Sequence, residues 1–270
     1  MNCYVINMEG ATHRWQHIKV EFARAGIQPI RFAGRTARDF PPHFFRWTLN
    51  KFLAEGWTEG ELGCLLSHLS IWEQLVTHNL PCAAIFEDDV VFGIGAKEAL
   101  ESMTFTDRAT IKKLETWFQP CFISRKPIQS MGKNNYFRLL SQHRGAAGYA
   151  LNQAAAKELL AMIAATPSRA DVLTFTPSMM RGRVVIDQLV PAVVIQQMFL
   201  SRQWRNPLLK STLSEERSQK AIDLKLNFTK RIFRRLIKTS CDLVIHFSGR
   251  RLVIPYRDST GRLIKSPAKS

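Results

Sequence analysis

The sequence predicts an α/β fold, with a mostly parallel sheet and helices on both faces. The first two hundred residues alternate short apolar runs with longer segments of helical spacing, which is the order of parallel strands and their covering helices. The chain has 270 residues, 46% of them hydrophobic, so it can bury one large core. We expect a main domain over residues 1–200 and a basic extension over residues 201–270.

The first elements alternate in type. Residues 3–8 form a short apolar run, and residues 12–27 follow with helical spacing and a stop at Gly26. The apolar face of this helix comprises Trp15, Ile18, Phe22 and Ala25. Residues 28–34 predict a second strand, so the chain begins strand, helix, strand.

A longer helix follows a loop that contains Pro and Phe. Thr58 and Glu61 have the spacing of a capping box, which predicts that the helix begins just after Thr58. A broad apolar stripe predicts that it lies against the sheet: Leu62, Leu65, Leu66, Leu69, Trp72 and Leu75 or Val76. Residues 83–86 then form a buried strand, and a further helix begins at Gln153.

Three consecutive acids, Glu87, Asp88 and Asp89, follow that buried strand. Open α/β sheets bind ligands at the carboxyl ends of their strands, so the location favours chemistry. Adjacent carboxylates raise one another's pKa unless a cation joins them, and hard oxygen ligands suit Mg²⁺ or Mn²⁺, which suit a diphosphate. From the residues alone, a helix N-cap cluster or a solvated turn is the favoured explanation for acids after a strand.

Composition argues against several classes of protein. The five cysteines are scattered without a CxxC pair, which predicts neither a disulfide framework nor a zinc knuckle and favours a reducing compartment. The chain does not begin with a basic segment followed by an apolar one, and no apolar run approaches the roughly 18 residues that span a bilayer. We therefore expect a cytoplasmic protein that does not cross the membrane.

Six blocks resemble glycosyltransferase family 25, which includes bacterial lipopolysaccharide and lipooligosaccharide galactosyltransferases. Covering about residues 3–197, they follow the family's order and approximate spacing: VINMEGATHR, GELGCLLSHLSIWE, AAIFEDDV, IKKLET, HRGAAGYALN and PAVVIQQ. The resemblance implies a GT-A-like fold, a Rossmann-type sheet that binds a nucleotide-sugar. It also implies transfer from UDP-galactose or a related UDP-sugar, with inversion at the anomeric carbon.

The resemblance also implies a donor site. The acids occupy the position of the family's D-x-D metal motif, so Asp89 is the first candidate ligand for Mn²⁺ (or Mg²⁺). Glu87 and Asp88 would contact the metal, the ribose or the sugar. Asn7 and Arg14 would hold the nucleotide, since a guanidinium can stack on uracil or fork onto an oxyanion. For Arg14, an ordinary exposed helix charge is the equal alternative.

Two further blocks add residues to the expected nucleotide-sugar site: Glu61, Gly63, Ser67, His68, Gly148 and Tyr149. Gly63 inside a helix is explained by close approach of a ligand, of another backbone or of a packed helix. His68 is a pocket hydrogen-bonding group or a structural histidine, and it points away from its neighbour Ser67. The loop with Gly148 would lie beside the transferred sugar, the alternative being a plain strand-to-helix turn.

An inverting transferase needs a base that takes the proton from the acceptor hydroxyl. Asp171 matches an acidic position that follows the helix from Gln153 in the family, and it is the first candidate. Asp187 is the second. The implied acceptor is a lipid A-core oligosaccharide.

The basic extension carries 12 of the 16 net positive charges. Residues 226–240 combine apolar residues at helical spacing with Lys and Arg, which is typical of an amphipathic helix on an anionic membrane surface. A helix packed on the main domain is the alternative. We expect a peripheral protein on the inner face of the bacterial inner membrane, with short strands over residues 242–247 and 250–256.

Two other functions are also compatible with the sequence. A metal-dependent nuclease or phosphoesterase could grip phosphates with its basic tail and hold Mg²⁺ with its acids. The tail aromatics lie on the apolar face and are not interleaved as stacking platforms, so no nucleic-acid partner is expected. The third possibility is a catalytically silent sugar-nucleotide binder, which would not hydrolyse the donor in the presence of Mn²⁺.

Overall fold

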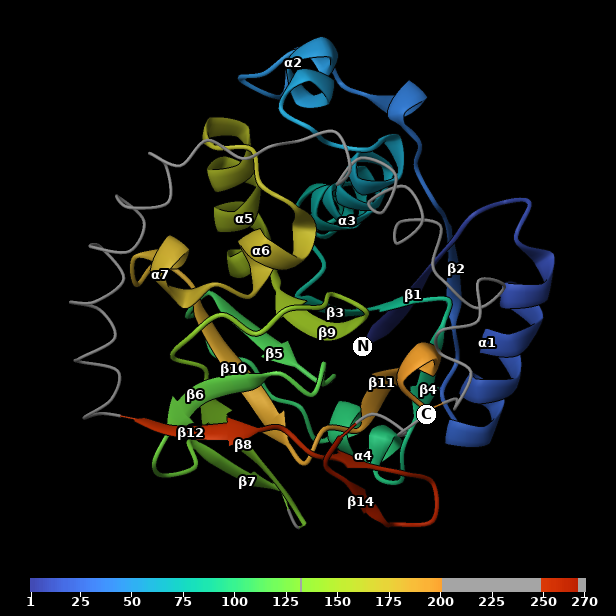
Figure 1. Ribbon diagram of the computed structural model, residues 1–270, viewed down its shortest axis with the longest axis vertical. Coiled ribbons are helices and arrows are strands. Elements are labelled where there is room, and N and C mark those ends of the chain that lie inside the picture. The colour runs from blue at the N-terminus through green and yellow to red at the C-terminus, as the bar shows by residue number, and fades with distance from the viewer. Residues whose placement is uncertain (132, 201–248, 267–270) are drawn as a thin grey trace.

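The computed structural model describes residues 1–131, 133–200 and 249–266. Its centre is an eight-stranded sheet (Figure 1). In order across the sheet, the strands are β2 (Ile30–Ala33), β1 (Asn2–Asn7), β3 (Cys82–Glu87), β9 (Gly148–Asn152), β5 (Thr110–Lys113), β10 (Val185–Val190), β8 (Asn134–Arg138) and β7 (Gln129–Met131).

Most strands of this sheet run in one direction, which confirms the predicted fold class. β1 is parallel to β2 and β3, and β5 is parallel to β10. β9 lies antiparallel between β3 and β5, and β8 is antiparallel to β10 and β7. The expected loop around Gly148 and Tyr149 is therefore corrected: both residues lie in β9, whose five residues are all buried.

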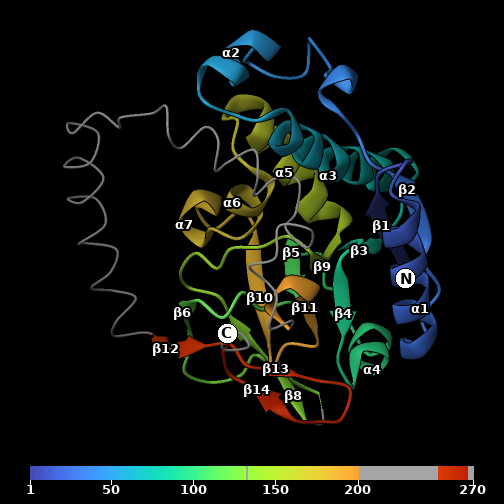
Figure 2. The same ribbon diagram turned by 45° about the vertical axis from the view of Figure 1, so that its right-hand side comes forward.

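Helices cover both faces of the sheet (Figures 1 and 2). On one face lie α3 (Glu59–Thr77), α5 (Gln153–Ala165) and α6 (Ala170–Thr174); on the other lie α1 (Thr12–Ala25) and α4 (Ala96–Glu101). Strand side chains alternate between the two cores, as the pleat requires: Tyr4 and Ile85 pack with α3, whereas Val5 and Phe86 pack with α1. The smaller helices are α2 (Leu49–Ala54), α7 (Pro177–Met180) and the 3₁₀ turns Ala37–Asp39 and Gln197–Phe199.

The predicted helix boundaries are confirmed. α1 ends at Gly26, which adopts the left-handed conformation with φ +68°. The capping box between Thr58 and Glu61 forms in both directions at the start of α3. The Asn152 side chain caps α5 by accepting from the backbone N–H of Ala155 at 3.0 Å.

The last described segment returns to the main sheet region. β12 (Gly249–Val253) pairs antiparallel with β6 (Pro120–Ser124), and β13 (Tyr256–Arg257) pairs with β14 (Leu263–Ile264). The predicted strand over residues 250–256 corresponds to β12 and the start of β13, with a break at Ile254 and Pro255. Ile254 and Tyr256 are buried. The predicted helix over 226–240 and strand over 242–247 lie outside the described residues. No helix within the described ranges is both long and apolar enough for a bilayer crossing.

Candidate functional site

The three acids lie where β3 turns into β4 (Val90–Phe92), at the carboxyl end of β3. β11 (Val194–Gln196) pairs antiparallel with β4, with Gln196 opposite Val90. The backbone N–H of Gln197 donates to the carbonyl of Asp89 at 2.8 Å. A segment more than one hundred residues away in sequence therefore lies against the acidic turn.

Gln196 is the centre of this contact. Its Nε2 lies 3.3 Å from Glu87 Oε2 and 3.2 Å from Asp89 Oδ2. Trp117 Nε1 donates to Gln196 Oε1 at 2.9 Å, which fixes the amide so that its NH₂ group faces the two acids. One neutral amide nitrogen thus lies between two carboxylates.

The two carboxylates are incompletely neutralised. Burial raises the pKa of Glu87 to about 7, with the positive charge of Arg14 opposing the rise. Burial and the nearby Glu87 raise the pKa of Asp89 to about 7. A divalent cation would stabilise both charged forms, and magnesium-class ions commonly use one or two carboxylates together with substrate phosphates. Glu87 and Asp89 therefore fit the expected Mn²⁺ or Mg²⁺.

Asp88 points elsewhere, toward β1 and α1. It accepts from Asn7 Nδ2 at 2.6 Å and pairs with Arg14 at 2.6 Å. Arg31 donates to Asn7 Oδ1 from Nε at 2.9 Å, so the Asn7 amide can only present its NH₂ group to Asp88. The structure brings Asn7 and Arg14 to the acidic turn, and the Arg14 side chain remains 30% exposed beside it.

His68 and Tyr149 meet in a buried group beside Glu87. His68 Nδ1 lies 2.9 Å from the Tyr149 hydroxyl, to which Trp72 Nε1 also donates at 2.9 Å. Burial lowers the pKa of His68 to about 4, so its ring is neutral near pH 7. His68 Nε2 lies 4.0 Å from Glu87 Oε1. These contacts place both predicted residues at the edge of the site.

Three predicted residues of α3 instead shape the surrounding backbone. Glu61 caps the helix and binds Arg169 Nε at 2.6 Å. A Cβ on Gly63 would lie 2.6 Å from the carbonyl oxygen of Arg35, so the close approach is by another backbone. Ser67 Oγ accepts from the Arg35 N–H at 2.8 Å. Through these contacts Glu61, Gly63 and Ser67 hold the loop after β2 and the start of α3.

Gly148 has a related packing role at the other border of the site. It lies opposite Phe86 in the sheet. A Cβ on Gly148 would come within 2.6 Å of the Val194 side chain. A larger residue at this position would push β11 away from the sheet, and with it Gln196.

The two candidate bases lie in different places. Asp171, half-buried on the first turn of α6, contributes to raising the pKa of Glu87 by its negative charge, so it lies within electrostatic reach of the acidic turn. Asp187 pairs with Arg138 at 3.0 Å, and burial raises its pKa. β10 is three strands from β3, about 14 Å across the sheet. The structure thus places Asp171 within electrostatic reach of Glu87 and leaves Asp187 apart.

Sequence reasoning missed a buried pair behind the site. Lys113 Nζ donates to Glu115 Oε1 at 2.7 Å, and both side chains are fully buried. Burial raises the pKa of Glu115 to about 7, with the charge of Glu87 a smaller contributor. Both residues, like Gln196, stand in blocks that carry the family resemblance, yet only the fold shows that they approach the acids.

A family model described as "Glycosyltransferase family 25 (LPS biosynthesis protein)" matches residues 1–174. The chain belongs to glycosyltransferase family 25. Family membership confirms the resemblance noted from the six blocks, and it argues against the nuclease alternative.

Individual relatives agree with this family. The chain is 29% identical to "Lacto-N-neotetraose biosynthesis glycosyltransferase LgtE" of Neisseria gonorrhoeae, over 81% of this chain and 82% of that protein. It is 33% identical to "Lipooligosaccharide biosynthesis protein lex-1" of Haemophilus influenzae, over 61% of this chain and 57% of that protein. Among solved structures, a glycosyltransferase involved in glycosylation of the major capsid of PBCV-1 aligns with a TM-score of 0.40 and 10% identity, covering 78% of this chain and 98% of that one.

Proposed function

We propose that this family 25 glycosyltransferase moves a hexose, with galactose as the first candidate, from a UDP-sugar to a lipopolysaccharide or lipooligosaccharide core acceptor, with inversion. The observation that carries the proposal is the convergence of Glu87 and Asp89 on one amide nitrogen at the carboxyl end of β3. The names of the relatives LgtE and lex-1, which refer to lacto-N-neotetraose and lipooligosaccharide biosynthesis, support this class of acceptor.

In this proposal Glu87 and Asp89 hold Mn²⁺ (or Mg²⁺), and Asp88 has a different task. The bound ion supplies Lewis-acid stabilisation of the charge on the departing UDP. Asp88 anchors the guanidinium of Arg14, which remains partly exposed to meet the nucleotide. Asn7 holds Asp88 in place from β1.

Asp171 acts as the base in this proposal. It takes the proton from the acceptor hydroxyl while that oxygen attacks the anomeric carbon from the face opposite UDP. Its place on α6, on the same face of the sheet as His68 and within electrostatic reach of Glu87, supports this role. Asp187 is the second candidate, because its ion pair with Arg138 holds it in another part of the sheet.

The decisive experiment replaces Asp89 with Ala. We expect Mn²⁺-dependent UDP release to fall by about 100-fold or more, because a metal ligand is lost from a site that stabilises the leaving group. Asp107→Ala, which removes an exposed acid, should keep wild-type turnover. Undiminished turnover in the Asp89 variant would contradict the metal assignment.

The same assay distinguishes the silent-binder alternative. A transferase should release UDP from at least one UDP-hexose, with the donor preference naming the sugar. Thermal stabilisation by UDP and Mn²⁺ without any UDP release from UDP-galactose, UDP-glucose or the N-acetylhexosamine donors would identify a binder instead.

We also propose that the protein works on the cytoplasmic surface of the inner membrane. The support is the basic composition of residues 201–270 and the amphipathic pattern of residues 226–240. An acceptor built on lipid A would be found at such a surface.

A further inference from the structure

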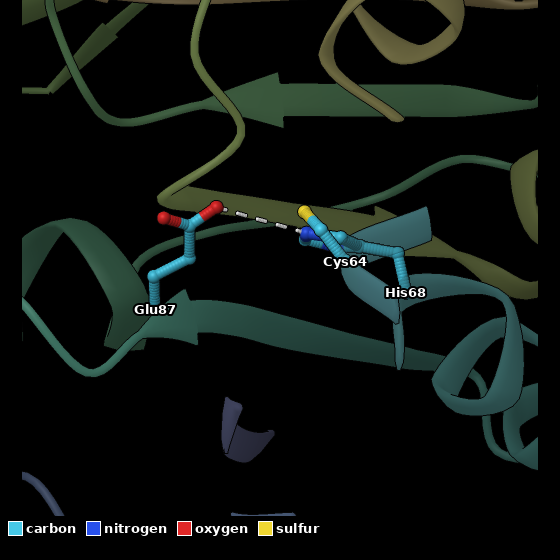
Figure 3. A group of neighbouring side chains, drawn as sticks. All are labelled: Cys64, His68 and Glu87. Carbon is cyan, nitrogen blue, oxygen red and sulfur yellow. Dashed lines mark ion pairs between the residues drawn. The ribbon is translucent and has the colours of Figure 1, made fainter. Parts of the chain in front are cut away.

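Two side chains of α3, Cys64 and His68, point toward the carboxylate of Glu87 (Figure 3). Cys64 and His68 are four residues apart, so they lie one above the other on the same side of the helix. Cys64 Sγ, one His68 ring nitrogen and one Glu87 carboxylate oxygen all lie within 4.8 Å of one another. Thiolate, imidazole and carboxylate are the three ligand types that zinc uses in proteins.

The His68 nitrogen that faces Glu87 is an unused ligand atom in the described part of the chain. His68 Nε2 is buried and has no hydrogen-bond partner among the residues that the structure describes. Its 4.0 Å distance from Glu87 Oε1 is too long for a hydrogen bond. Ligand atoms on a tetrahedral zinc ion lie about 3.3 to 3.6 Å apart, so closing the three groups onto one ion needs a contraction of about 1 Å.

The surroundings hold His68 in an orientation suited to a ligand. The Tyr149 oxygen has two lone pairs, so it can accept from both Trp72 Nε1–H and His68 Nδ1–H. In that tautomer Nε2 presents its lone pair toward Glu87. A metal-bound histidine ordinarily donates its other N–H in this way. Cys64 and Glu87 are only half-buried, which leaves an entry path for an ion.

We propose that Cys64, His68 and Glu87 form a second cation site, selective for a thiophilic divalent ion of the zinc class. A sulfur and nitrogen ligand set favours such an ion over Mn²⁺ or Mg²⁺. Binding releases the Cys64 thiol proton to solvent, and a fourth position stays open on the ion. Glu87 Oε1 faces this site and Oε2 faces Gln196, so one carboxylate borders both cation positions. The inference goes beyond transferase activity and needs no nucleotide.

The test titrates the metal-free, full-length protein with Co²⁺, a spectroscopic substitute for Zn²⁺. We expect a thiolate-to-cobalt charge-transfer absorption that saturates at about one equivalent and is displaced by Zn²⁺. Cys64→Ser should abolish the absorption, and His68→Gln should weaken Co²⁺ binding by about 10-fold or more. Cys82→Ser is the matched control, since Cys82 lies at the opposite end of β3, and it should keep the absorption.

Two results would overturn the proposal: folded wild-type protein that gives no thiolate absorption, or an absorption that persists in the Cys64 variant. Circular dichroism checks each fold, and Cys64→Ala replaces Cys64→Ser if the serine variant unfolds. Asp89→Ala should keep the Co²⁺–thiolate absorption while losing Mn²⁺-dependent UDP release. Failure of the donor-site proposal is thereby separated from failure of this one.

Discussion

Among single side chains, Gln196 decides how the acidic turn is arranged. Its amide contacts Glu87 and Asp89, while Asn7 and Arg14 bind Asp88. Arg14 also lies 3.4 Å from Asp89, so it links the two groups of acids. Three adjacent acids therefore divide between two tasks. The sequence predicts that a cation belongs here, but the partition depends on an amide that the chain supplies more than one hundred residues later.

The raised pKa values of Glu87 and Asp89 give a pH dependence whose sign can be tested. A carboxyl in the unfolded chain has a pKa near 4, and in the folded protein these two have values of about 7. Between about pH 4 and pH 7, the folded, metal-free protein therefore binds more protons at these two groups than the unfolded chain does. Their contribution to the free energy of unfolding is fully present below about pH 4 and is lost as pH rises through about 7.

We therefore expect the free energy of unfolding of metal-free Asp89→Asn to fall less than that of the wild type between about pH 5 and pH 8. Urea titrations at each pH measure it, and Asp107→Asn, an exposed acid, should follow the wild type. Mn²⁺ affinity should weaken below about pH 7, because the ion must displace protons. Parallel curves for wild type and Asp89→Asn would contradict the assigned burial.

Asp171→Asn tests the base. We expect kcat to fall by about 100-fold or more, since general bases contribute factors of that size, while the Kd for UDP with Mn²⁺ stays within about 3-fold. Steady-state kinetics and calorimetry give the two values. Asp187→Asn is the comparison: a loss of kcat there with normal turnover in Asp171→Asn would move the role to Asp187.

At the scale of the elements, α1 and α3 fix two backbone segments near the site, β4 and the loop after β2. The α1 side chains of His17 and Glu21 bond to the backbone of β4, at Val90 O (3.1 Å) and Phe92 N (3.0 Å) respectively. On the other face, the Gly63 position of α3 packs against the backbone of Arg35. Polar contacts from α1 therefore fix β4, which follows the acidic turn, whereas the close backbone packing at Gly63 fixes the loop after β2.

Gly63→Ala tests the backbone contact. A Cβ there would lie 2.6 Å from the Arg35 carbonyl, and we expect overpacking to cost about 1–3 kcal/mol, more than the roughly 1 kcal/mol that Ala gains in a helix. Chemical denaturation measures the net loss. Gly10→Ala, where a Cβ meets nothing within 4 Å, should stay within about 0.5 kcal/mol of the wild type. Equal stability of both variants would contradict the close packing.

At the scale of the whole molecule, the last part of the basic extension packs on the main domain. The residues that follow 201–248 contact β6 and Thr116. β12 pairs with β6, and Thr116 Oγ1 donates to the carbonyl of Ile254 at 2.7 Å. A truncation from about residue 222 would therefore remove β12 and expose part of the core. Membrane attachment has to be tested without shortening the chain.

We expect neutralisation of five basic residues to weaken binding to anionic vesicles, each charge near the surface contributing about 1 kcal/mol. The substitution to Gln covers Lys230, Arg231, Arg234, Arg235 and Lys238. Vesicle sedimentation measures binding, and transfer to a soluble acceptor should be unchanged. Neutralising Arg181 and Arg183, which are exposed on the main domain, is the control. Equal vesicle binding by the five-residue variant would contradict the membrane proposal.

The linear pattern of residues was sufficient for α1, α3 and the strand that ends in Glu87, because periodicity, capping and turn signals act over a few residues. It also identified the three acids as candidate site residues, because three consecutive charges after a buried strand can be recognised without knowing the tertiary structure. It did not find that β9 begins at Gly148, because the two glycines Gly145 and Gly148 indicate a turn and only the flanking strands show otherwise. Nor did it show the convergence of Gln196, Cys64 and His68 on Glu87, because that depends on strand order and helix packing between segments distant in sequence.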